Sequence, residues 1–303
     1  MKKQPVVFNS LSELHKAMGQ PRPSHPLISI MNYGEAHFDP KDFEQGIILN
    51  FYKISFKTGF SGKLRYGQGY YDFEEGGMSF IAPGQLLRMQ DEEADYSGMT
   101  LHIHPDFLRN YQLGKSIKQY GFFSYSAAEA LYLSEKEKTT ILSVYQFIHD
   151  ELQQRIDKFS QDVIISQIEV LLNYANRFYD RQFITRKAVN SDILVNLEAL
   201  LDAYFNDDES LISGLPTVNS VAAALHLTPR YLSDMLRNLI GLNTQQYIHE
   251  KVIEKAKEYL AKDELTVAEV AYHLGFEHPQ SFNKLFKSKT SLSPLDYKKS
   301  LLN

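Results

Sequence analysis

The last third of the sequence repeats one short pattern. Residues 217–225 read Thr-Val-Asn-Ser-Val-Ala-Ala-Ala-Leu, and residues 266–274 read Thr-Val-Ala-Glu-Val-Ala-Tyr-His-Leu. Each copy leads through a short turn into a second segment that begins at a proline, Pro229 or Pro279. The copies are offset by 49 residues before the turn and by 50 after it, so the one insertion lies in the turn, where it disturbs packing least. The pattern predicts two successive pairs of helices, each pair joined by a tight turn.

Local signals support each helix pair. In the first copy, apolar residues recur at helical spacing, which predicts one buried face. They are Val218, Val221, Ala222 and Leu225. Thr228 is a helix N-cap, and Thr266 with Glu269 forms a capping box. The turn of the second copy has Gly275, which suits a positive φ, and the first copy has His226 at that place.

The second helix of each pair carries a polar outward face. In the first pair this face holds Arg230, Ser233, Asp234, Arg237 and Asn238. In the second pair it holds Gln280, Ser281, Asn283, Lys284 and Lys287. Amide side chains can bond adenine at two atoms, and arginine or lysine can bond guanine. One such face is also what any solvated helix shows, but two in register indicate recognition helices that enter the major groove of DNA.

A helix expected over residues 244–262 separates the two pairs. Its apolar positions recur at helical spacing. They are Ile248, Val252 or Ile253, Ala256 and Leu260. A rigid spacer matters because two recognition helices on one face of a duplex have to lie about 34 Å apart.

Composition limits the class of protein. The 303 residues, 43% hydrophobic and 23% charged, suffice for two ordinary domains. Because cysteine is absent, disulfides, thiolate metal sites and thiol nucleophiles are excluded. A DNA-repair protein that accepts methyl groups is excluded as well, because it needs a reactive cysteine. The net charge is −5, but residues 214–303 hold 11 Lys and Arg against 9 Asp and Glu, a local balance of +2. No apolar run suits a membrane span and no secretory signal is visible, so we expect a cytoplasmic protein.

The first part of the sequence has a different pattern. Residues 1–26 look irregular, because Pro21, Pro23 and Pro26 follow one another closely. Residues 27–105 read as short strands with β-branched and aromatic residues. Many short strands divided by glycine predict an antiparallel barrel or sandwich.

Two long helices are expected after these strands, within residues 106–181. The first opens at the capping box of Ser134 and Glu137. Both carry an apolar stripe, so they form a hairpin that packs on the strands or pairs with a second copy of the chain. The polar segment 183–190 is expected to be a linker, and Ser191 to cap the next helix.

Residues 191–303 resemble the DNA-binding domain of the AraC/XylS family of bacterial transcription regulators. The resemblance is carried by residues 267–276, 279–287 and 292–297, which together make up nearly the whole family signature. It implies a seven-helix domain with two helix-turn-helix units, in a regulator that usually activates transcription with RNA polymerase. By position, it assigns base contacts to Arg230, Ser233 and Asp234 in the first unit, and to Gln280, Asn283 and Lys284 in the second.

Three positions depart from the family pattern. Asp234 stands where a basic residue is frequent, Val252 where arginine is frequent, and Ser291 where glycine is usual. A carboxylate that faces DNA repels phosphate, although it can accept a hydrogen bond from cytosine.

The strands resemble, more loosely, the cupin-like sensory domain of many family members, with Gly77 and Pro83 in part of a cupin motif. The resemblance therefore implies a two-domain α+β protein, with a sensory and dimerisation domain over residues 1–182 and a DNA-binding domain over residues 191–303. Its expected partners are double-stranded DNA, a small effector and a second copy of the chain.

A pocket for a small effector is expected among the aromatic and basic residues of the strands. Its candidate residues are Tyr52, Phe56, Arg65 and Arg88. The arginines favour an anionic ligand, although aromatic residues in strands are mostly core.

An alternative is a cupin-type enzyme or metal-binding protein fused to a DNA-binding module. His102 and His104 share a strand face, as a pair of metal ligands would. A third ligand would have to be His37 or Asp39, and no spacing argument supports either. We therefore expect no metal, no cofactor and no catalytic residues.

Overall fold

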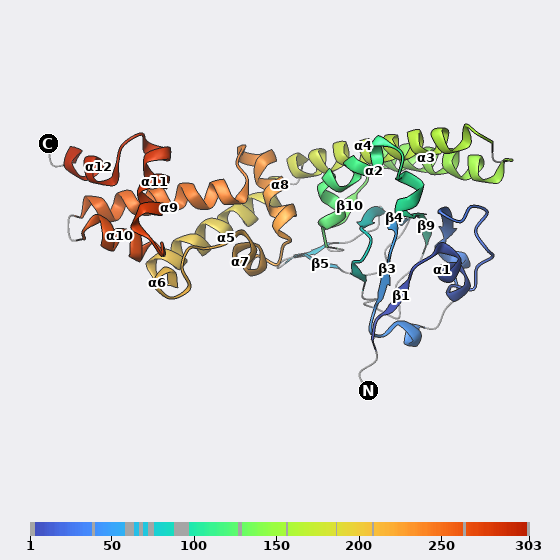
Figure 1. Cartoon of the computed structure of the whole chain (residues 1–303), viewed down its shortest axis with the longest axis horizontal. Helices are drawn as coiled ribbons and strands as arrows, with labels where there is room; N and C mark the ends of the chain where they lie inside the picture. Colours follow the sequence, from blue (N-terminus) through green and yellow to red (C-terminus); the bar gives the residue numbers. More distant parts are fainter. Residues whose placement is uncertain are drawn as a thin grey trace. The chain divides into compact units, whose positions relative to one another are not determined.

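The chain divides into two compact units, Met1–Gln182 and Phe183–Asn303, in a computed structural model (Figure 1). The structure describes residues 4–37, 40–57, 64–66, 69–71, 76–87, 97–126, 129–155, 157–185, 187–207, 209–262 and 265–301. The first unit combines sheets and helices, and the described part of the second is helical.

A five-stranded antiparallel sheet is the main layer of the first unit. Its strands, in spatial order, are β10 (Leu131–Tyr132), β7 (Gly77–Ile81), β4 (Tyr52–Lys57), β9 (Gly98–Ile103) and β2 (Ile28–Asn32). Side chains alternate between the two faces of a sheet. Ile54 lies opposite Leu101 on the apolar face, and Ser55 lies opposite Thr100 on the other.

The remaining described strands do not extend this sheet. β1 (Val6–Phe8), β3 (Ile47–Leu49) and β8 (Leu86–Leu87) form a second sheet, in which β1 runs parallel to β3. β5 (Leu64–Tyr66) and β6 (Gly69–Tyr71) form a separate two-stranded antiparallel sheet.

The expected closed antiparallel barrel is therefore wrong for the strands that the structure describes. β2 and β10 are the two edges of the five-stranded sheet, and no described strand connects them. A barrel closes only when every strand has a partner on both sides. The alternation of apolar and polar residues along one strand reveals which face of that strand is buried, but it does not reveal which other strand pairs with it.

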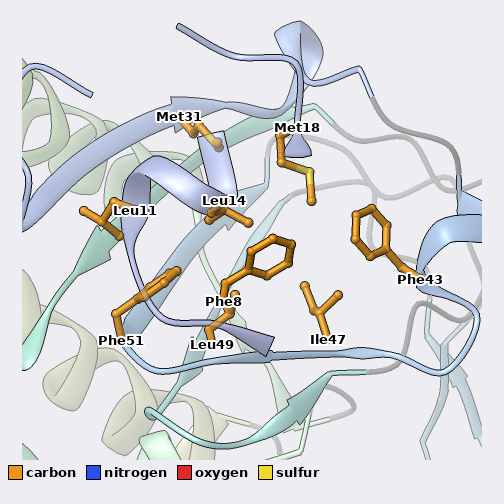
Figure 2. Packing of buried hydrophobic residues seen from close by; sticks show 9 residues of the cluster. All are labelled: Phe8, Leu11, Leu14, Met18, Met31, Phe43, Ile47, Leu49 and Phe51. Carbon is orange, nitrogen blue, oxygen red and sulfur yellow. The ribbon is translucent and has the colours of Figure 1, made fainter. Parts of the chain in front are cut away.

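The expectation of irregular structure over residues 1–26 is also wrong in part. β1 is followed by helix α1 (Leu11–Ala17), which opens at a capping box formed by Ser10 and Glu13. Figure 2 shows how α1, β1 and β3 enclose a hydrophobic cluster. The cluster contains Phe8, Leu11, Leu14, Met18, Met31, Phe43, Ile47, Leu49 and Phe51. The Ser-x-x-Glu spacing is the sequence signal for this helix.

Two long helices pack on the apolar face of the main sheet. They are α3 (Glu135–Gln153) and α4 (Ser160–Thr185), and α3 starts at the predicted capping box of Ser134 and Glu137, which is confirmed. The Tyr145 hydroxyl on α3 donates to the Ile54 carbonyl at 2.8 Å, and the Tyr179 ring on α4 packs on Phe80. Short segments precede them: η3 (Pro105–Leu108), α2 (Gln112–Ser116), η4 (Ile117–Gln119) and η5 (Gly121–Ser124).

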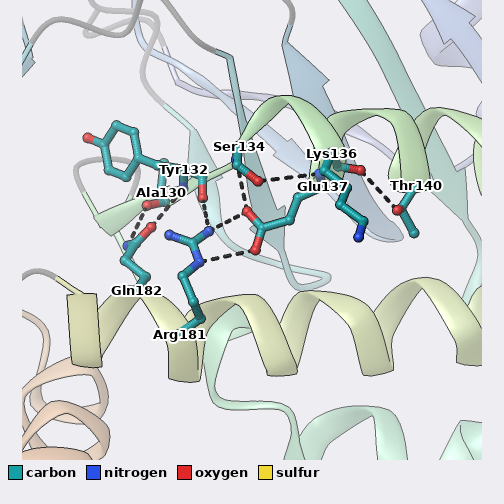
Figure 3. Close-up of polar contacts among 8 residues, drawn as sticks. All are labelled: Ala130, Tyr132, Ser134, Lys136, Glu137, Thr140, Arg181 and Gln182. Atoms are coloured by element: carbon teal, nitrogen blue, oxygen red, sulfur yellow. Dashed lines mark hydrogen bonds and ion pairs between the residues drawn. The ribbon is translucent and has the colours of Figure 1, made fainter.

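Polar contacts fasten α4 to the start of α3 and to β10 (Figure 3). The Arg181 guanidinium donates to both carboxylate oxygens of Glu137, at 3.1 and 2.6 Å, and to the Tyr132 carbonyl at 2.7 Å. Gln182 accepts from the Tyr132 amide at 2.8 Å and donates to the Ala130 carbonyl at 3.2 Å. Tyr132 lies on β10, which is an edge strand among the described strands, so Arg181 and Gln182 supply the partners of its outward backbone groups.

Eight described helices make up the second unit, against the seven that the resemblance implies. They are α5 (Lys187–Asn206), α6 (Glu209–Ser213), α7 (Val218–Ala224), α8 (Pro229–Ile240), α9 (Thr244–Ala261), α10 (Val267–His273), α11 (Pro279–Thr290) and α12 (Pro294–Ser300). The segment 183–190 is mostly helical, because α4 continues to Thr185 and α5 begins at Lys187. The prediction that Ser191 caps a helix is therefore wrong, since Ser191 lies inside α5.

Candidate nucleic-acid interface

Two helix pairs of similar construction, α7 with α8 and α10 with α11, dominate the second unit. The predicted caps at Thr228 and Thr266 are confirmed, since each accepts a hydrogen bond from a backbone amide of the helix that follows. Thr217 caps α7 in the same way, a cap that was not predicted from the sequence. The turns also agree with the sequence, because His226 has a φ of 57° and Gly275 a φ of 87°. The repeat in the sequence is thus a repeat in local structure.

Both pairs pack on α9. In the first pair, Val221 and Ala222 of α7 and Leu232 and Leu236 of α8 are buried. In the second, the equivalent buried residues are Val270, Ala271, Phe282 and Phe286. Helices α7, α8, α10, α11 and α12 all contact α9. α9 has 18 residues, so it is about 27 Å long, and it joins the two pairs into one rigid framework.

The outward face of α8 is an ion-paired cluster. Asp234 accepts a hydrogen bond from Arg230 Nε at 2.9 Å and another from Arg237 Nη1 at 2.6 Å. Both arginines are exposed, and Asp234 is partly buried between them. The carboxylate that departs from the family pattern is therefore neutralised by two cations on its own helix.

Ser233, the other expected base contact of α8, lies toward α9. Its hydroxyl is 2.9 Å from the hydroxyl of Thr244, which is fully buried. Asn238 donates from its side chain to the Asp234 carbonyl at 3.0 Å. The structure therefore brings Arg230, Asp234 and Arg237 together and places Ser233 against the framework, so its role as a base contact stays a prediction.

The outward face of α11 differs from that of α8. Gln280, Ser281, Asn283, Lys284 and Lys287 are all exposed. Within the part of the chain that the structure describes, none of these five side chains has a hydrogen-bond or ion-pair partner. The inward residues Phe282 and Phe286 are fully buried, which fixes the rotation of the helix and presents the five polar side chains together.

A groove of about 920 Å³ lies between α11, the start of α10 and α12. Its lining includes four lysines: Lys284, Lys287, Lys298 and Lys299. The neighbouring carboxylates of Glu269 and Asp296 are engaged in the caps of α10 and α12. Hydrogen bonds from Thr266 hold the pKa of Glu269 below its usual range. Four cations around a concave surface favour a polyanion such as the DNA backbone.

Reasoning from the sequence missed Lys298 and Lys299. They stand on α12, outside the repeated helix pairs, and Lys298 donates to the Leu265 carbonyl at 2.8 Å. The available signal was the pair of adjacent lysines, but only the packing of α12 beside α11 brings them to the same groove.

The expected effector residues lie in the first unit. Tyr52 and Phe56 are 5% and 0% exposed, and their rings pack against Phe123 and Tyr145. Both therefore contribute to the core between the main sheet and the helices. The side chain of Arg65 and the whole of Arg88 lie outside the described residues.

The two candidate metal ligands of the first unit do not act as a pair. His104 caps η3, since its Nδ1 accepts from the Asp106 amide at 3.2 Å. His102 is buried on the polar face of the main sheet, where its ring packs edge-on to Phe51 at a centroid distance of 5.6 Å. Among the described residues, no group of three metal-binding side chains lies close enough to hold an ion. His37 is exposed and bonds the Glu35 carbonyl, and Asp39 is outside the described residues.

Burial sets the charge of His102. Desolvation, together with the nearby positive charges of Lys53 and His15, holds the pKa of His102 well below its usual range. In the part of the chain that the structure describes, His102 Nδ1 has no hydrogen-bond partner, and its Nε2 lies 3.5 Å from the Thr100 hydroxyl. The neutral imidazole of His102 lies opposite Lys53 on the polar face of the sheet, beside the facing pair Ser55 and Thr100.

The family profile that matches this chain lies within the second unit. Residues 221–300 match a protein-family profile described as "Helix-turn-helix domain". YijO of Escherichia coli (strain K12), an uncharacterized HTH-type transcriptional regulator, is 35% identical over 92 residues, which are 30% of this chain and 32% of YijO. The HTH-type transcriptional activator RhaS of Escherichia coli O157:H7 is 28% identical over 138 residues, which are 45% of each chain.

A solved structure is similar over a comparable part of the chain. The C-terminal domain of the two-component response regulator yesN from Fusobacterium nucleatum is 31% identical, with 34% of this chain and 98% of that domain covered and a TM-score of 0.29. The chain thus spans about a third of the length of YijO and less than half of RhaS. Among the described residues, no helix is both long and apolar enough to cross a bilayer.

Proposed function

We propose that this chain, whose C-terminal unit is an AraC/XylS-type helix-turn-helix domain, is a transcription regulator that binds a specific DNA sequence through α8 and α11. Relatives that match this chain are named as HTH-type transcriptional regulators, and RhaS is named as an activator. Gln280, Asn283 and Lys284 of α11, with Arg230 of α8, read base edges. Lys287 and Arg237 contact phosphate.

The observation that carries the proposal is the state of α11. Five polar or basic side chains are exposed together on one side of this helix, while its two phenylalanines are sealed in the core. The same side opens onto a groove with four lysines. A recognition helix needs this combination, because base edges require exposed hydrogen-bonding groups and phosphates require cations nearby.

The first unit supplies the signal in this proposal. It senses a small effector and, in response, changes the placement of the DNA-binding units. The regulator acts in the cytoplasm, where RNA polymerase responds to the complex that it forms with DNA. The polar face of the main sheet supports a site for a polar ligand. Ser55 and His102 are buried there beside the half-buried Lys53, and His102 Nδ1 has no hydrogen-bond partner among the described residues, which is a costly arrangement for a buried polar atom. Tyr52, Phe56, Arg65 and Arg88 remain the candidate effector residues from the sequence.

Dimerisation through the helical hairpin completes the proposal. Phe147 on α3 and Val163 and Val170 on α4 are 59%, 43% and 39% exposed, although they are large and apolar. A second copy of the chain would cover them. Sedimentation of the purified chain tests this step: a monomer at tens of micromolar would contradict it.

The DNA-binding function is tested by selection from a random-sequence duplex library. The full chain is expected to enrich one asymmetric site in two parts separated by about one helical turn, as two recognition helices require. Footprinting on that site should show that the protein protects one face of the DNA duplex. Failure to enrich any sequence would overturn the proposed function.

A further inference from the structure

We propose that Asp234 is a positioning residue: its carboxylate holds the Arg230 and Arg237 side chains ready for DNA, and it does not itself read a base. The inference rests on the proposed function and deepens it. It concerns the one position of α8 at which the sequence departs from the basic residue frequent in the family.

The geometry divides the carboxylate between two arginines. Oδ2 of Asp234 accepts from Arg230 Nε, and Oδ1 accepts from Arg237 Nη1. The Asp234 side chain is 16% exposed, whereas the arginines are 47% and 48% exposed. A cytosine amino group would have to approach the carboxylate between two guanidinium groups. Asp234 is therefore poorly placed to accept from a base, and the arginines are well placed to donate.

The atom that Arg230 uses is informative. Its bond to Asp234 is made through Nε, so both terminal nitrogens keep their hydrogens for another acceptor. Those two nitrogens are the ones that can bond guanine at O6 and N7. Arg230 also stands in the first turn of α8, and the first residues of a recognition helix are the ones that meet base edges. The structure thus points to a guanine opposite Arg230.

Arg237 has a different place. It lies in the last turn of α8, which opens at Pro229 and ends at Ile240, and it is bonded through a terminal nitrogen. From this end of the helix a guanidinium meets the DNA backbone more readily than a base edge. One carboxylate therefore holds a base-reading arginine and a phosphate-binding arginine in fixed relation.

Holding the arginines in advance affects recognition more than folding. An exposed ion pair contributes little to the stability of a protein. A long side chain that is already ordered, however, loses less conformational freedom when it binds. Without Asp234, Arg230 would still carry its charge, but it would have to be ordered by the DNA itself.

A simpler explanation, repulsion of phosphate by Asp234, predicts a different effect on discrimination between DNA sequences. If Asp234 only repels phosphate, its removal strengthens binding to every DNA sequence alike. If it positions Arg230, its removal strengthens binding to random DNA, because one negative charge is lost, and weakens discrimination. The ratio of specific to random affinity separates the two explanations.

The experiment uses the full chain and two fluorescent duplexes, one selected by the wild-type protein from a random library and one scrambled. Affinities are measured by anisotropy at several salt concentrations. Asp234→Ala is expected to lower the ratio of specific to random affinity about tenfold. Asp234→Asn, which keeps the shape of the side chain, should lower the ratio of specific to random affinity by a smaller factor. Thermal melting of both variants verifies that the unit stays folded.

Two further variants locate the effect. In the Arg230→Ala background, adding Asp234→Ala should not lower the ratio further, because the arginine to be positioned is gone. Glu258→Ala is the matched control: it removes one carboxylate that pairs with a lysine on α9, and it should leave the ratio unchanged.

Three results would overturn the inference. Asp234→Ala could raise both affinities equally, which would mean repulsion alone. The loss of discrimination could persist in the Arg230→Ala background, which would mean that Asp234 reads a base itself. If the wild-type chain selects no sequence at all, the proposed function fails together with the inference; the first two results leave that function intact.

Discussion

The Arg181 guanidinium binds the Glu137 carboxylate at both oxygens and so joins α4 to the cap of α3. Arg181→Ala would leave this carboxylate, which is 15% exposed, with fewer donors, and the Tyr132 carbonyl without its guanidinium partner. We expect the free energy of unfolding to fall by about 2 kcal/mol, since each lost bond involves a charged group. Urea denaturation measures this change.

Arg177→Ala is the control for that substitution. Arg177 lies on the same helix, one turn earlier, and is exposed. Its removal should change stability by less than about 0.5 kcal/mol. Equal effects of the two substitutions would show that the bond to Glu137 contributes nothing specific.

Acid should destabilise the first unit through His102. Because burial lowers the pKa of His102 in the folded chain, the unfolded chain binds a proton first as the pH falls. The stability contributed by the neutral imidazole is therefore present above about pH 6.5 and is lost as the pH decreases toward the folded pKa. The slope attributable to one such group is at most about 1.4 kcal/mol per pH unit.

His102→Gln tests this slope, because glutamine does not titrate. Urea denaturation at pH 7 and pH 5.5 should show a smaller loss of stability in the variant than in the wild type. The pKa values of His15 and His25 are also lowered by burial, so part of the slope should remain. An unchanged slope in the variant would contradict the role of His102.

Two glycines at helix ends should tolerate alanine unequally. Gly275 has a φ of 87°, and a Cβ there would lie 2.4 Å from the carbonyl carbon of Gly214. Gly241 has a φ of 76°, and a Cβ there would meet nothing within 4 Å. Gly241→Ala should cost about 1–2 kcal/mol, the ordinary cost of a left-handed backbone. Gly275→Ala should cost at least about 3 kcal/mol, because backbone has to move as well.

Thermal denaturation of both variants gives the comparison. Gly241→Ala is itself the matched control, since it adds the same methyl group at a similar φ. Equal losses would mean that the approach of Gly214 to Gly275 is not maintained in solution.

Substitutions of the α11 side chains should have two kinds of effect on DNA binding, depending on whether the side chain contacts a base or a phosphate. Gln280→Ala and Lys284→Ala should each lower affinity for a selected DNA site by about 1–3 kcal/mol and relax the preference at one base pair. Lys287→Ala should weaken binding to all sequences alike and reduce the slope of log affinity against log salt by about one. Anisotropy titrations on selected and scrambled duplexes distinguish these outcomes. Equal losses on both duplexes for all three variants would contradict the assignment.

Lys299 should behave as a phosphate contact although it lies outside the repeated helix pairs. Lys299→Ala removes one cation from the groove beside α11, so the salt slope should fall by about one while discrimination between sequences stays constant. Lys118→Ala removes an exposed lysine of the first unit and serves as the control. If both variants change the salt slope equally, α12 takes no particular part in binding.

Much of the second unit could be predicted because its signals are local. The caps at Thr228 and Thr266 and the positive φ of Gly275 depend on residues only a few positions apart. Helical spacing alone also distinguishes the buried Phe282 from the exposed Lys284, because the two residues fall on opposite sides of one helix.

Predictions failed where the answer depended on segments far apart in the sequence. Alternation in β4 and β9 indicated strands, but it could not show that the described strands form separate sheets and not a barrel. The segment 183–190 lacks an apolar stripe, which does not predict a helix, yet α4 and α5 occupy most of it; its role as a linker stays a prediction. Tertiary contacts override weak local preferences in such segments.

The sequence by itself determined the two helix pairs and which side of each second helix faces outward, because periodicity and caps act within a single helix. Only the tertiary structure decided what those outward residues meet. Packing on α9 turned Ser233 toward Thr244, and packing of α12 beside α11 brought Lys299 into a groove with Lys284. Contacts of this kind depend on distances in space, which spacing along the chain does not specify.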